Sequence, residues 1–550
     1  MEQHRVVRTV SEAAVAARRG EVDAARHLLV LAERLALEEV AIEARRCTDI
    51  DKQPGGNNGR NAGRHGNTGR DEGVCVNSTV GARTPGDQKE GADALVYVVF
   101  ISAAAAMGGF LFGYDSSVIN GAVEAIRGRY DIGSATLAQV VAIALIGCAV
   151  GAAIAGRVAD RIGRIWVMRI AATLFTCSAI GSALPFALWD LAMWRVIGGI
   201  GIGMASVIGP AYIAEVSPPA YRGRLASFQQ AAIVIGIATS QLVNFAILKM
   251  AGGEQRGHIG GLEAWQWMLG VMVVPAALYG LFSFTIPESP RYLISVGKTD
   301  KAKQVLTEVE GNTGDLDARV AEIERAMHSE HRSTFKDLLG SGFGFLPVVW
   351  IGIGLSVFQQ LVGINVVFYY SATLWQSVGI DPSSSFFYSF TTSIINIVGT
   401  VIAVTLVDRI GRKPLALIGS AGMAIALGLE AWAFSAKTGS GDSVALPHAQ
   451  GIVALVSAHV FVLFFALSWG VVVWVLLGEM FPNKLRAAAL GVAASAQWIA
   501  NWVITASFPS LADWNLSGTY VIYTVFALLS IPFVLKWVPE TKGKSLEEMG

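Results

Sequence analysis

The amino-acid sequence predicts an all-α membrane protein with twelve transmembrane helices arranged in two six-helix bundles. Of its 550 residues, 53% are hydrophobic and 15% are charged, whereas a soluble chain carries roughly 25% charged residues. After about residue 93 the chain contains apolar stretches close to the ~20 residues that a helix needs to cross a bilayer. The pentapeptide Asp-Arg-Ile-Gly-Arg occurs at 160–164 and again at 408–412. This duplication indicates two homologous halves.

The apolar stretches place the spans in two sets. The expected spans are 95–120, 138–158, 165–184, 188–210, 226–249 and 265–286 in the first set, and 346–375, 384–407, 414–436, 450–478, 486–509 and 517–538 in the second. The chain therefore divides into five parts. We expect an N-terminal extension (1–92), a first bundle (93–286), a helical linker (287–345), a second bundle (346–538) and a C-terminal tail (539–550).

Two polar segments lie outside the spans. In the linker, 299–310 and 316–329 place charged residues around apolar positions, which is typical of small surface helices. Residues 11–46 of the extension also resemble a helix, and 54–91 are rich in Gly, Asn and Arg, as a flexible linker is. Two interpretations of the extension stay open: a cytoplasmic regulatory tail, or a dispensable addition from a mis-assigned start.

The short loops indicate an orientation. Basic residues are concentrated in the loops after the second, fourth, eighth and tenth spans, and the positive-inside rule places such loops in the cytoplasm. We therefore expect a multi-pass protein of the plasma or inner membrane with both termini and the linker in the cytoplasm.

Charged motifs repeat at this expected inner face. Glu215 precedes Arg222 as Glu479 precedes Arg486, and Pro287-Glu-Ser returns as Pro539-Glu-Thr. We expect a cytoplasmic gate of paired charges that latches this side when it is closed. Its residues are Asp160, Arg161, Arg164, Glu215 and Arg222 in the first half, and Asp408, Arg409, Arg412, Glu479 and Arg486 in the second. Alternatively, the arginines only set the topology, although that does not explain their acidic partners.

Seven motifs occur together in one order. They are Gly113-Tyr-Asp, Asp160 to Arg164, Arg195 with its following glycines, Pro210 to Glu215, Pro287 to Leu293, Gln359 to Asn365 and Pro539 to Gly543. With these motifs, the core from about 95 to 549 resembles the sugar porter family of the major facilitator superfamily, and most closely its bacterial proton-coupled pentose and hexose symporters. The resemblance implies two bundles that rock about a central sugar site.

Amide side chains inside the expected spans suit a sugar ligand. Amides both donate and accept hydrogen bonds, as sugar hydroxyls do, and polar groups in a membrane are usually functional. The resemblance places seven residues at sugar-contacting positions and two nearby: Gln230, Gln359, Gln360, Asn365, Trp474, Gln497 and Trp498, with Asn396 and Asn501. We expect Gly363 to let the helix unwind between Gln359 and Asn365. The alternative is that these amides only join helices by hydrogen bonds.

Asp115 and Arg195 indicate how transport could be driven by protons. Counted from the expected span ends, both lie roughly 8–10 Å below the outer surface, so they could meet. Protonation of Asp115 would release Arg195, which is what proton coupling requires. The resemblance agrees, because its proton-coupled members carry an aspartate here. A permanently ionised pair that only joins two helices is the alternative.

One departure from the family pattern concerns span ten. Val471 stands where a proline is typical, and proline kinks helices. We therefore expect a stiffer span ten.

Together these features predict a proton symporter of a pentose or hexose that works by alternating access. A passive sugar uniporter and, less well supported, a transporter-like sugar sensor are the competing functions. No nucleophile–base or metal-ligand cluster suggests an enzyme, and we expect no cofactor and no metal. The partners expected are the sugar, the proton and the lipid bilayer, with no nucleic acid because the net charge is zero. We expect the monomer to be functional.

Overall fold

A computed structural model describes residues 85–218, 222–310, 316–329, 335–340, 344–438, 446–482 and 485–542. All of them belong to one compact unit, Gly81–Gly550. The predictions for residues 1–84 lie outside the described residues, and so does most of the C-terminal tail.

The first half is a bundle of long helices. Its elements are α3 (Pro85–Val118), η1 (Ile119–Gly121), α4 (Val123–Tyr130), α5 (Ser134–Ile162), α6 (Arg164–Ala183), α7 (Leu188–Val216), α8 (Arg222–Met250), the strands β1 (His258–Ile259) and β2 (Leu262–Glu263), α9 (Ala264–Gly270) and α10 (Val273–Phe282). The two strands pair as a short antiparallel hairpin between α8 and α9.

The linker and the second half follow. The linker contains α11 (Pro290–Ser295), α12 (Thr299–Glu310), α13 (Leu316–Ser329) and η2 (Phe335–Leu338). The second half contains α14 (Pro347–Leu361), α15 (Ile364–Gln376), α16 (Pro382–Ile410), α17 (Arg412–Ser435), α18 (His448–Leu467), α19 (Trp469–Met480) and α20 (Arg486–Trp537). Helices α12 and α13 have the bounds that the sequence predicts.

Within the described residues, eleven candidate membrane helices account for the twelve predicted spans. Ten match single predicted spans, and the eleventh, Ala488–Trp537, is 50 residues long. At 1.5 Å per residue it would extend about 75 Å, more than twice the ~30 Å hydrocarbon core. Asn515, with φ −163° and ψ 101°, interrupts it. The segment therefore supplies two spans that meet at Asn515, and the all-α membrane fold is confirmed.

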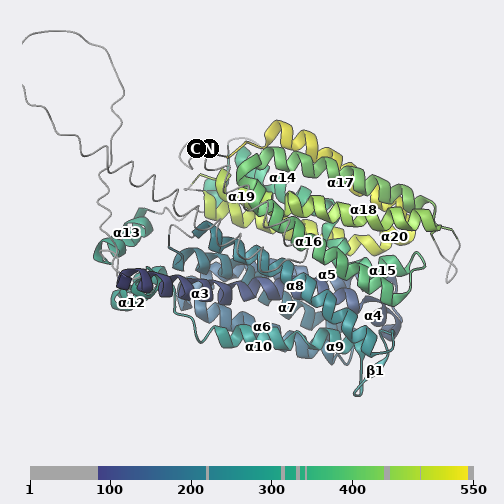
Figure 1. Cartoon of the computed structure of the whole chain (residues 1–550), viewed down its shortest axis with the longest axis horizontal. Coiled ribbons are helices and arrows are strands. Elements are labelled where there is room, and N and C mark those ends of the chain that lie inside the picture. The colour runs from purple at the N-terminus through teal and green to yellow at the C-terminus, as the bar shows by residue number, and fades with distance from the viewer. Residues whose placement is uncertain are drawn as a thin grey trace, which may run out of the picture. The chain divides into compact units, whose positions relative to one another are not determined.

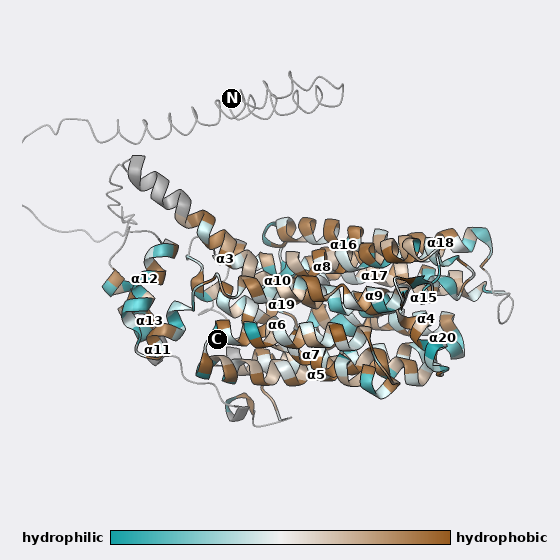
Figure 2. Ribbon diagram, turned by 90° about the horizontal axis from the view of Figure 1, so that it is seen from below, coloured by the Kyte–Doolittle hydropathy of each residue, from teal (hydrophilic) through white to brown (hydrophobic). Residues whose placement is uncertain are grey.

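The two ends of the bundle differ in what they carry. In Figure 1, α12 and α13 lie at one end, which we call the linker end, and α4, β1 and the end of α15 lie at the other, which we call the opposite end. In Figure 2 the long helices are predominantly hydrophobic along their length, whereas α11 to α13 and the opposite end are more hydrophilic. This distribution fits a bundle whose middle lies in lipid and whose ends meet water.

The halves are joined by hydrogen bonds toward the opposite end. Asn120 donates to Ser371 over 3.2 Å and accepts from the backbone N–H of Ala372 over 3.0 Å. Gln241 donates to the carbonyl of Phe368 over 3.4 Å and accepts from Asn120 over 3.2 Å. At the linker end, the ion pairs of Arg164 join elements of the first half and those of Arg412 join elements of the second. The polar contacts described here thus hold the halves together on the side away from the linker.

Glycines bring the helices of the first half into backbone contact. A β-carbon at Gly113 of α3 would overlap the carbonyl oxygen of Ile233 in α8. One at Gly203 of α7 would overlap the carbonyl oxygen of Cys148 in α5 and lie 2.6 Å from the nitrogen of Ala152. Small residues permit this close approach of membrane helices, where van der Waals packing replaces the hydrophobic effect as the driving force.

This packing predicts opposite effects for two glycine substitutions. Gly203→Ala should destabilise the protein by about 1–3 kcal/mol, because backbone cannot yield to the new methyl group. The matched control is Gly156→Ala in α5, where a β-carbon meets open space. It should stabilise the helix by up to about 1 kcal/mol. Thermal unfolding of both variants in detergent checks this, and equal melting temperatures would contradict the packing argument.

Candidate functional site

The predicted helix break lies at Gly363, between the amides. Helix α14 ends at Leu361 and α15 begins at Ile364, with Gly363 in the left-handed region at φ 83°. A side chain there would be strained, so glycine permits the break. The expectation that this helix unwinds between Gln359 and Asn365 is therefore confirmed.

Three amides form a chain of hydrogen bonds across the break. Gln359 Nε2 donates to the carbonyl of Trp469 over 2.8 Å, and Gln360 Nε2 donates to Gln359 Oε1 over 3.2 Å. Asn365 Nδ2 donates to Gln360 Oε1. Each amide is thereby oriented by its neighbour. Gln359 and Gln360 are 3% and 4% exposed, while Asn365 is half-buried, so the chain runs from the interior toward a more accessible group.

Span ten provides the anchor for this chain. Trp469, whose carbonyl accepts from Gln359, begins α19 and donates its indole N–H to Ser420 over 2.9 Å. Helix α18 ends at Leu467, and Ser468 adopts φ −131° and ψ −90°. The span is therefore broken at Ser468 even though Val471 stands in place of proline; whether Val471 stiffens the span stays a prediction. Sequence reasoning also missed Trp469, although it lies only five residues before the predicted Trp474.

The other predicted sugar residues occupy different settings. Trp498 is 9% exposed and packs edge-on against Phe112 of the other half, with ring centroids 5.6 Å apart. Trp474 is 45% exposed. Asn501 accepts from Thr505 over 3.0 Å within α20, a bond inside one helix that joins no two helices.

The three remaining predicted amides lie on three elements. Gln230 of α8 is half-buried, and Asn396 of α16 is 6% exposed. Gln497 of α20 has a buried Oε1 that accepts no hydrogen bond from the described residues. Their contact with sugar remains a prediction.

Asp115 and Arg195 meet, as their depth in the spans suggests. Arg195 Nη1 lies 2.9 Å from Asp115 Oδ1, and each residue is 2% exposed. Arg195 Nε has no hydrogen-bond partner among the described residues. Tyr369 of α15, in the other half, is buried near enough to the pair to be influenced by both of its charges. The pair is thus buried near the interface between the halves; its part in proton coupling remains a prediction.

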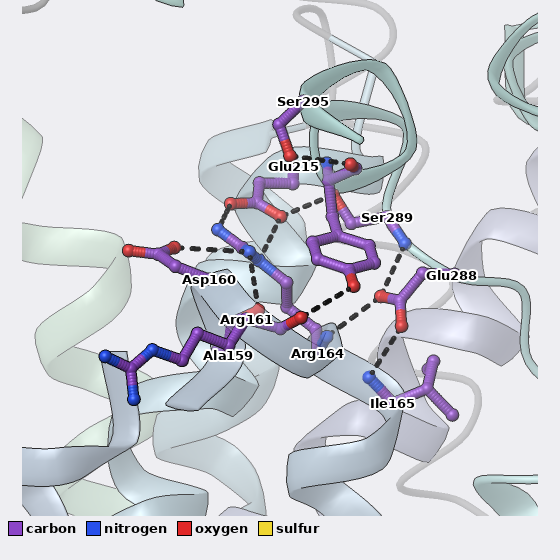
Figure 3. A network of polar contacts seen from close by, with 10 residues as sticks. Ala159, Asp160, Arg161, Arg164, Ile165, Glu215, Glu288, Ser289 and Ser295 are labelled. Carbon is purple, nitrogen blue, oxygen red and sulfur yellow. Dashed lines mark hydrogen bonds and ion pairs between the residues drawn. The ribbon is translucent and has the colours of Figure 1, made fainter. Parts of the chain in front are cut away.

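The first charged cluster at the linker end centres on Arg164 (Figure 3). Its guanidinium donates two hydrogen bonds to Glu215, each 3.0 Å, and lies 3.4 Å from Asp160. Glu288 accepts from the backbone N–H groups of Arg164 and Ile165 over 3.0 and 3.2 Å, and so caps the N-terminus of α6. Carboxylates stabilise helix N-termini because they satisfy free N–H groups and oppose the positive end of the helix dipole.

The second cluster repeats this arrangement in the other half. Arg412 donates to Glu479 over 3.0 and 2.7 Å and lies 3.0 Å from Asp408. Glu540 accepts from the backbone N–H groups of Arg412 and Lys413 over 3.0 and 2.9 Å, so it caps α17. We call the two groups the Arg164 cluster and the Arg412 cluster.

The repeated Pro-Glu-Ser/Thr motif is explained by these clusters. Ser289 donates to Glu215, and Thr541 donates to Glu479. The sequence showed the duplication of Glu288 and Glu540 but not their role, and neither was predicted as a site residue.

The predicted gate residues are only partly brought together. The side chain of Arg161 extends away from the Arg164 cluster, and Arg409 is exposed. Their backbone carbonyls accept from Tyr292 and Lys542, respectively. The side chains of Arg222 and Arg486 lie outside the described residues.

The two capping carboxylates differ in acidity. Burial raises the pKa of Glu288 above its ordinary value of 4.5, even though backbone N–H groups and Arg164 favour the carboxylate. At Glu540, burial also raises the pKa, but hydrogen bonds from four backbone N–H groups outweigh it, so the pKa lies below 4.5. The two caps should therefore respond differently to pH.

Glu540→Gln should lower stability by about 1 kcal/mol at neutral pH, the usual value of a helix cap. Because the pKa of Glu540 is depressed, its contribution is present above pH 4.5 and is lost as the pH falls through the folded-state pKa. The difference in stability between the variant and the unchanged protein should therefore become smaller as the pH falls.

Glu288→Gln is the matched comparison. The raised pKa of Glu288 means that its titration stabilises the fold below pH 4.5 and loses that effect as the pH rises. Glu288→Gln should therefore lower the stability less than Glu540→Gln does at neutral pH. The apparent melting temperatures of the two variants, measured from about pH 4 to pH 7, check this expectation. Parallel pH profiles would contradict the difference in acidity between Glu288 and Glu540.

Comparison with known proteins agrees with this geometry. The family model described as "Sugar (and other) transporter" matches residues 101–550. The glucose transport protein of Synechocystis sp. is 52% identical over 455 residues, covering 82% of this chain and 97% of that protein. The D-xylose-proton symporter of Escherichia coli K12 is 38% identical over 486 residues, covering 82% and 95%.

A solved structure is similar as well. The xylose transporter of Escherichia coli in an inward-open conformation matches with a TM-score of 0.70 and 36% sequence identity, covering 82% of this chain and 99% of that one. The chain belongs to the sugar transporter family. It is a membrane transporter with multiple spans and not an enzyme.

Proposed function

We propose that the protein takes up a neutral pentose or hexose together with a proton by alternating access. One observation carries the proposal: α15 bears both Asn365, the last amide of the hydrogen-bonded chain, and Tyr369, which lies near the Asp115–Arg195 pair. Residues four apart lie on the same face of a helix. A shift of α15 on sugar binding would therefore change the surroundings of the ion pair.

The chemistry of both groups suits this function. The amides offer neutral donors and acceptors to sugar hydroxyls, and Trp498 and Phe112 offer aromatic surface to the ring faces. Protonation of Asp115 would remove the charge that holds Arg195 and so weaken the contact between α3 and α7. Sugar and proton would then bias the same equilibrium between two arrangements of the halves.

The relatives support the class of substrate. The glucose transport protein and the D-xylose-proton symporter are named for a hexose and for a pentose with a proton. We propose the same substrate class here, in a plasma or inner membrane with the linker end in the cytoplasm. The Arg164 and Arg412 clusters would act there in gating, in a protein that is functional as a monomer.

Uptake into proteoliposomes tests the proposal. Labelled D-glucose, D-xylose, L-arabinose, D-galactose and myo-inositol are compared with and without an inward proton gradient. We expect at least one monosaccharide to accumulate above its outside concentration and to equilibrate when a protonophore is added. If every sugar only equilibrates, with or without the proton gradient, the protein is a uniporter. If a sugar binds but is not taken up, the protein is a sensor.

A further inference from the structure

Besides Asp115 and Asp190, the acidic side chain of Glu430 is buried within the membrane part of the protein. It lies in α17, five residues before the end of that helix at Ser435, and is 1% exposed. Neither Oε1 nor Oε2 has a hydrogen-bond partner among the described residues. Lys437, the cation nearest along the chain, is exposed. This setting differs from that of Asp115, which is paired with Arg195.

Tyr520 of α20 lies near Glu430, and Tyr523 of the same helix lies next to Tyr520. Tyr520 interacts electrostatically with Glu430, and its ring packs against Phe434, one turn further along α17, with centroids 4.9 Å apart. The rings of Tyr520 and Tyr523 are 5.9 Å apart. The hydroxyl groups of both tyrosines are buried without a partner among the described residues. His459 of α18, which also packs on α17, is bonded instead to Thr391 of α16.

Tyr523 connects this group to the sugar-site helix. A β-carbon at Gly363 would lie 2.7 Å from Cδ2 of Tyr523, so the tyrosine ring packs directly on the break between α14 and α15. The amides Gln360 and Asn365 flank that break. Glu430, Tyr520, Tyr523 and Gly363 are therefore a continuous line of neighbours from a buried carboxyl to the proposed sugar site.

We propose that Glu430 is a second proton-binding site, linked through Tyr520 and Tyr523 to the Gly363 hinge. An ionised carboxylate without a donor or a cation is strongly disfavoured in a membrane interior, so in this arrangement Glu430 holds its proton. Movement of α20 against α17 would bring the two free tyrosine hydroxyls to the carboxyl group as donors. The carboxylic acid would then release its proton to water and become a hydrogen-bonded carboxylate, while Tyr523 leaves Gly363.

Infrared spectroscopy of the full-length protein tests the proton site. At neutral pH we expect the C=O band of a protonated carboxylic acid, shifted in D2O and completely lost in Glu430→Gln. Asp190→Asn is the matched control, because Asp190 is also buried but accepts from the N–H of Phe186 over 3.2 Å. It should leave that band in place. Should Glu430→Gln not fold, Glu430→Asp keeps an acid on a shorter arm and should move the band. Absence of a band that depends on residue 430 would overturn the proposal.

Addition of sugar tests the link to the hinge, which rests on the proposed function. The probe is whichever of D-glucose, D-xylose or L-arabinose calorimetry shows to bind. We expect saturating sugar to shift or reduce the Glu430 band, and Tyr523→Phe to diminish that response several-fold. A band indifferent to bound sugar would overturn the link. The infrared measurements in H2O and D2O need no transport, so a failure of symport leaves them unaffected and the two proposals are tested separately.

Discussion

Asp115→Asn is expected to abolish accumulation of sugar against a gradient while sugar exchange continues. Asparagine keeps the shape of the side chain but cannot bind or release a proton. Proton entry can then no longer be coupled to the movement of the two halves. The accumulation ratio in proteoliposomes with an inward proton gradient should fall to one. Exchange of external labelled sugar for internal unlabelled sugar needs no proton cycle and should persist.

The substitution also leaves Arg195 without its partner at 2.9 Å. Loss of one member of a buried ion pair typically costs about 3–5 kcal/mol, so the melting temperature of the variant must be measured alongside transport. Asp190→Asn is the control, since it removes a buried carboxyl from α7 without touching Arg195. It should retain accumulation. A folded Asp115→Asn protein that still accumulates sugar would exclude Asp115 as the coupling group.

Gln360→Leu is expected to weaken sugar binding about 10- to 100-fold. Gln360 is the middle of the amide chain, where it donates to Gln359 and accepts from Asn365. Leucine fills the space but removes a direct donor and acceptor and frees the orientation of Asn365. Hydrogen bonds of this kind contribute about 1–3 kcal/mol when a partner is left unsatisfied, and 1.4 kcal/mol is a factor of ten in affinity.

Gln376→Leu supplies the matched control for this measurement. Gln376 is the last residue of α15, and its Nε2 has no partner among the described residues. Its replacement should leave affinity unchanged. Calorimetric titration of both variants with the transported sugar decides the matter, and equal affinities would favour the view that the amides only join helices.

Much of the fold followed from local features of the sequence. Continuous apolar stretches set the spans, because a membrane helix must satisfy its backbone hydrogen bonds within itself and present apolar side chains to lipid. Gly363 marked a helix break for an equally local reason, since only glycine adopts φ 83° without strain. Depth along two helices was enough to predict that Asp115 and Arg195 meet.

The roles of Glu288 and Glu540 could not be obtained in this way. Glu288 caps a helix that begins more than a hundred residues earlier, at Arg164, and Glu540 does the same for Arg412. The sequence repeated the motif without showing its partner. The break at Ser468 was missed because only proline was considered as the cause of a kink, whereas kinks also occur at Gly and Ser residues.

The sequence by itself determined that this is a two-fold repeated membrane transporter, and it predicted which amides would contact the sugar and which ion pair would respond to the proton. Those features depend on hydropathy, spacing and motif order, which are properties of the chain. Only the tertiary structure decided which acidic groups are satisfied. Asp115 pairs with Arg195, Glu288 and Glu540 cap helix N-termini, and Glu430 lies near Tyr520 with no hydrogen-bond partner among the described residues. The energy of a buried charge depends on its neighbours, and those neighbours come from distant parts of the chain.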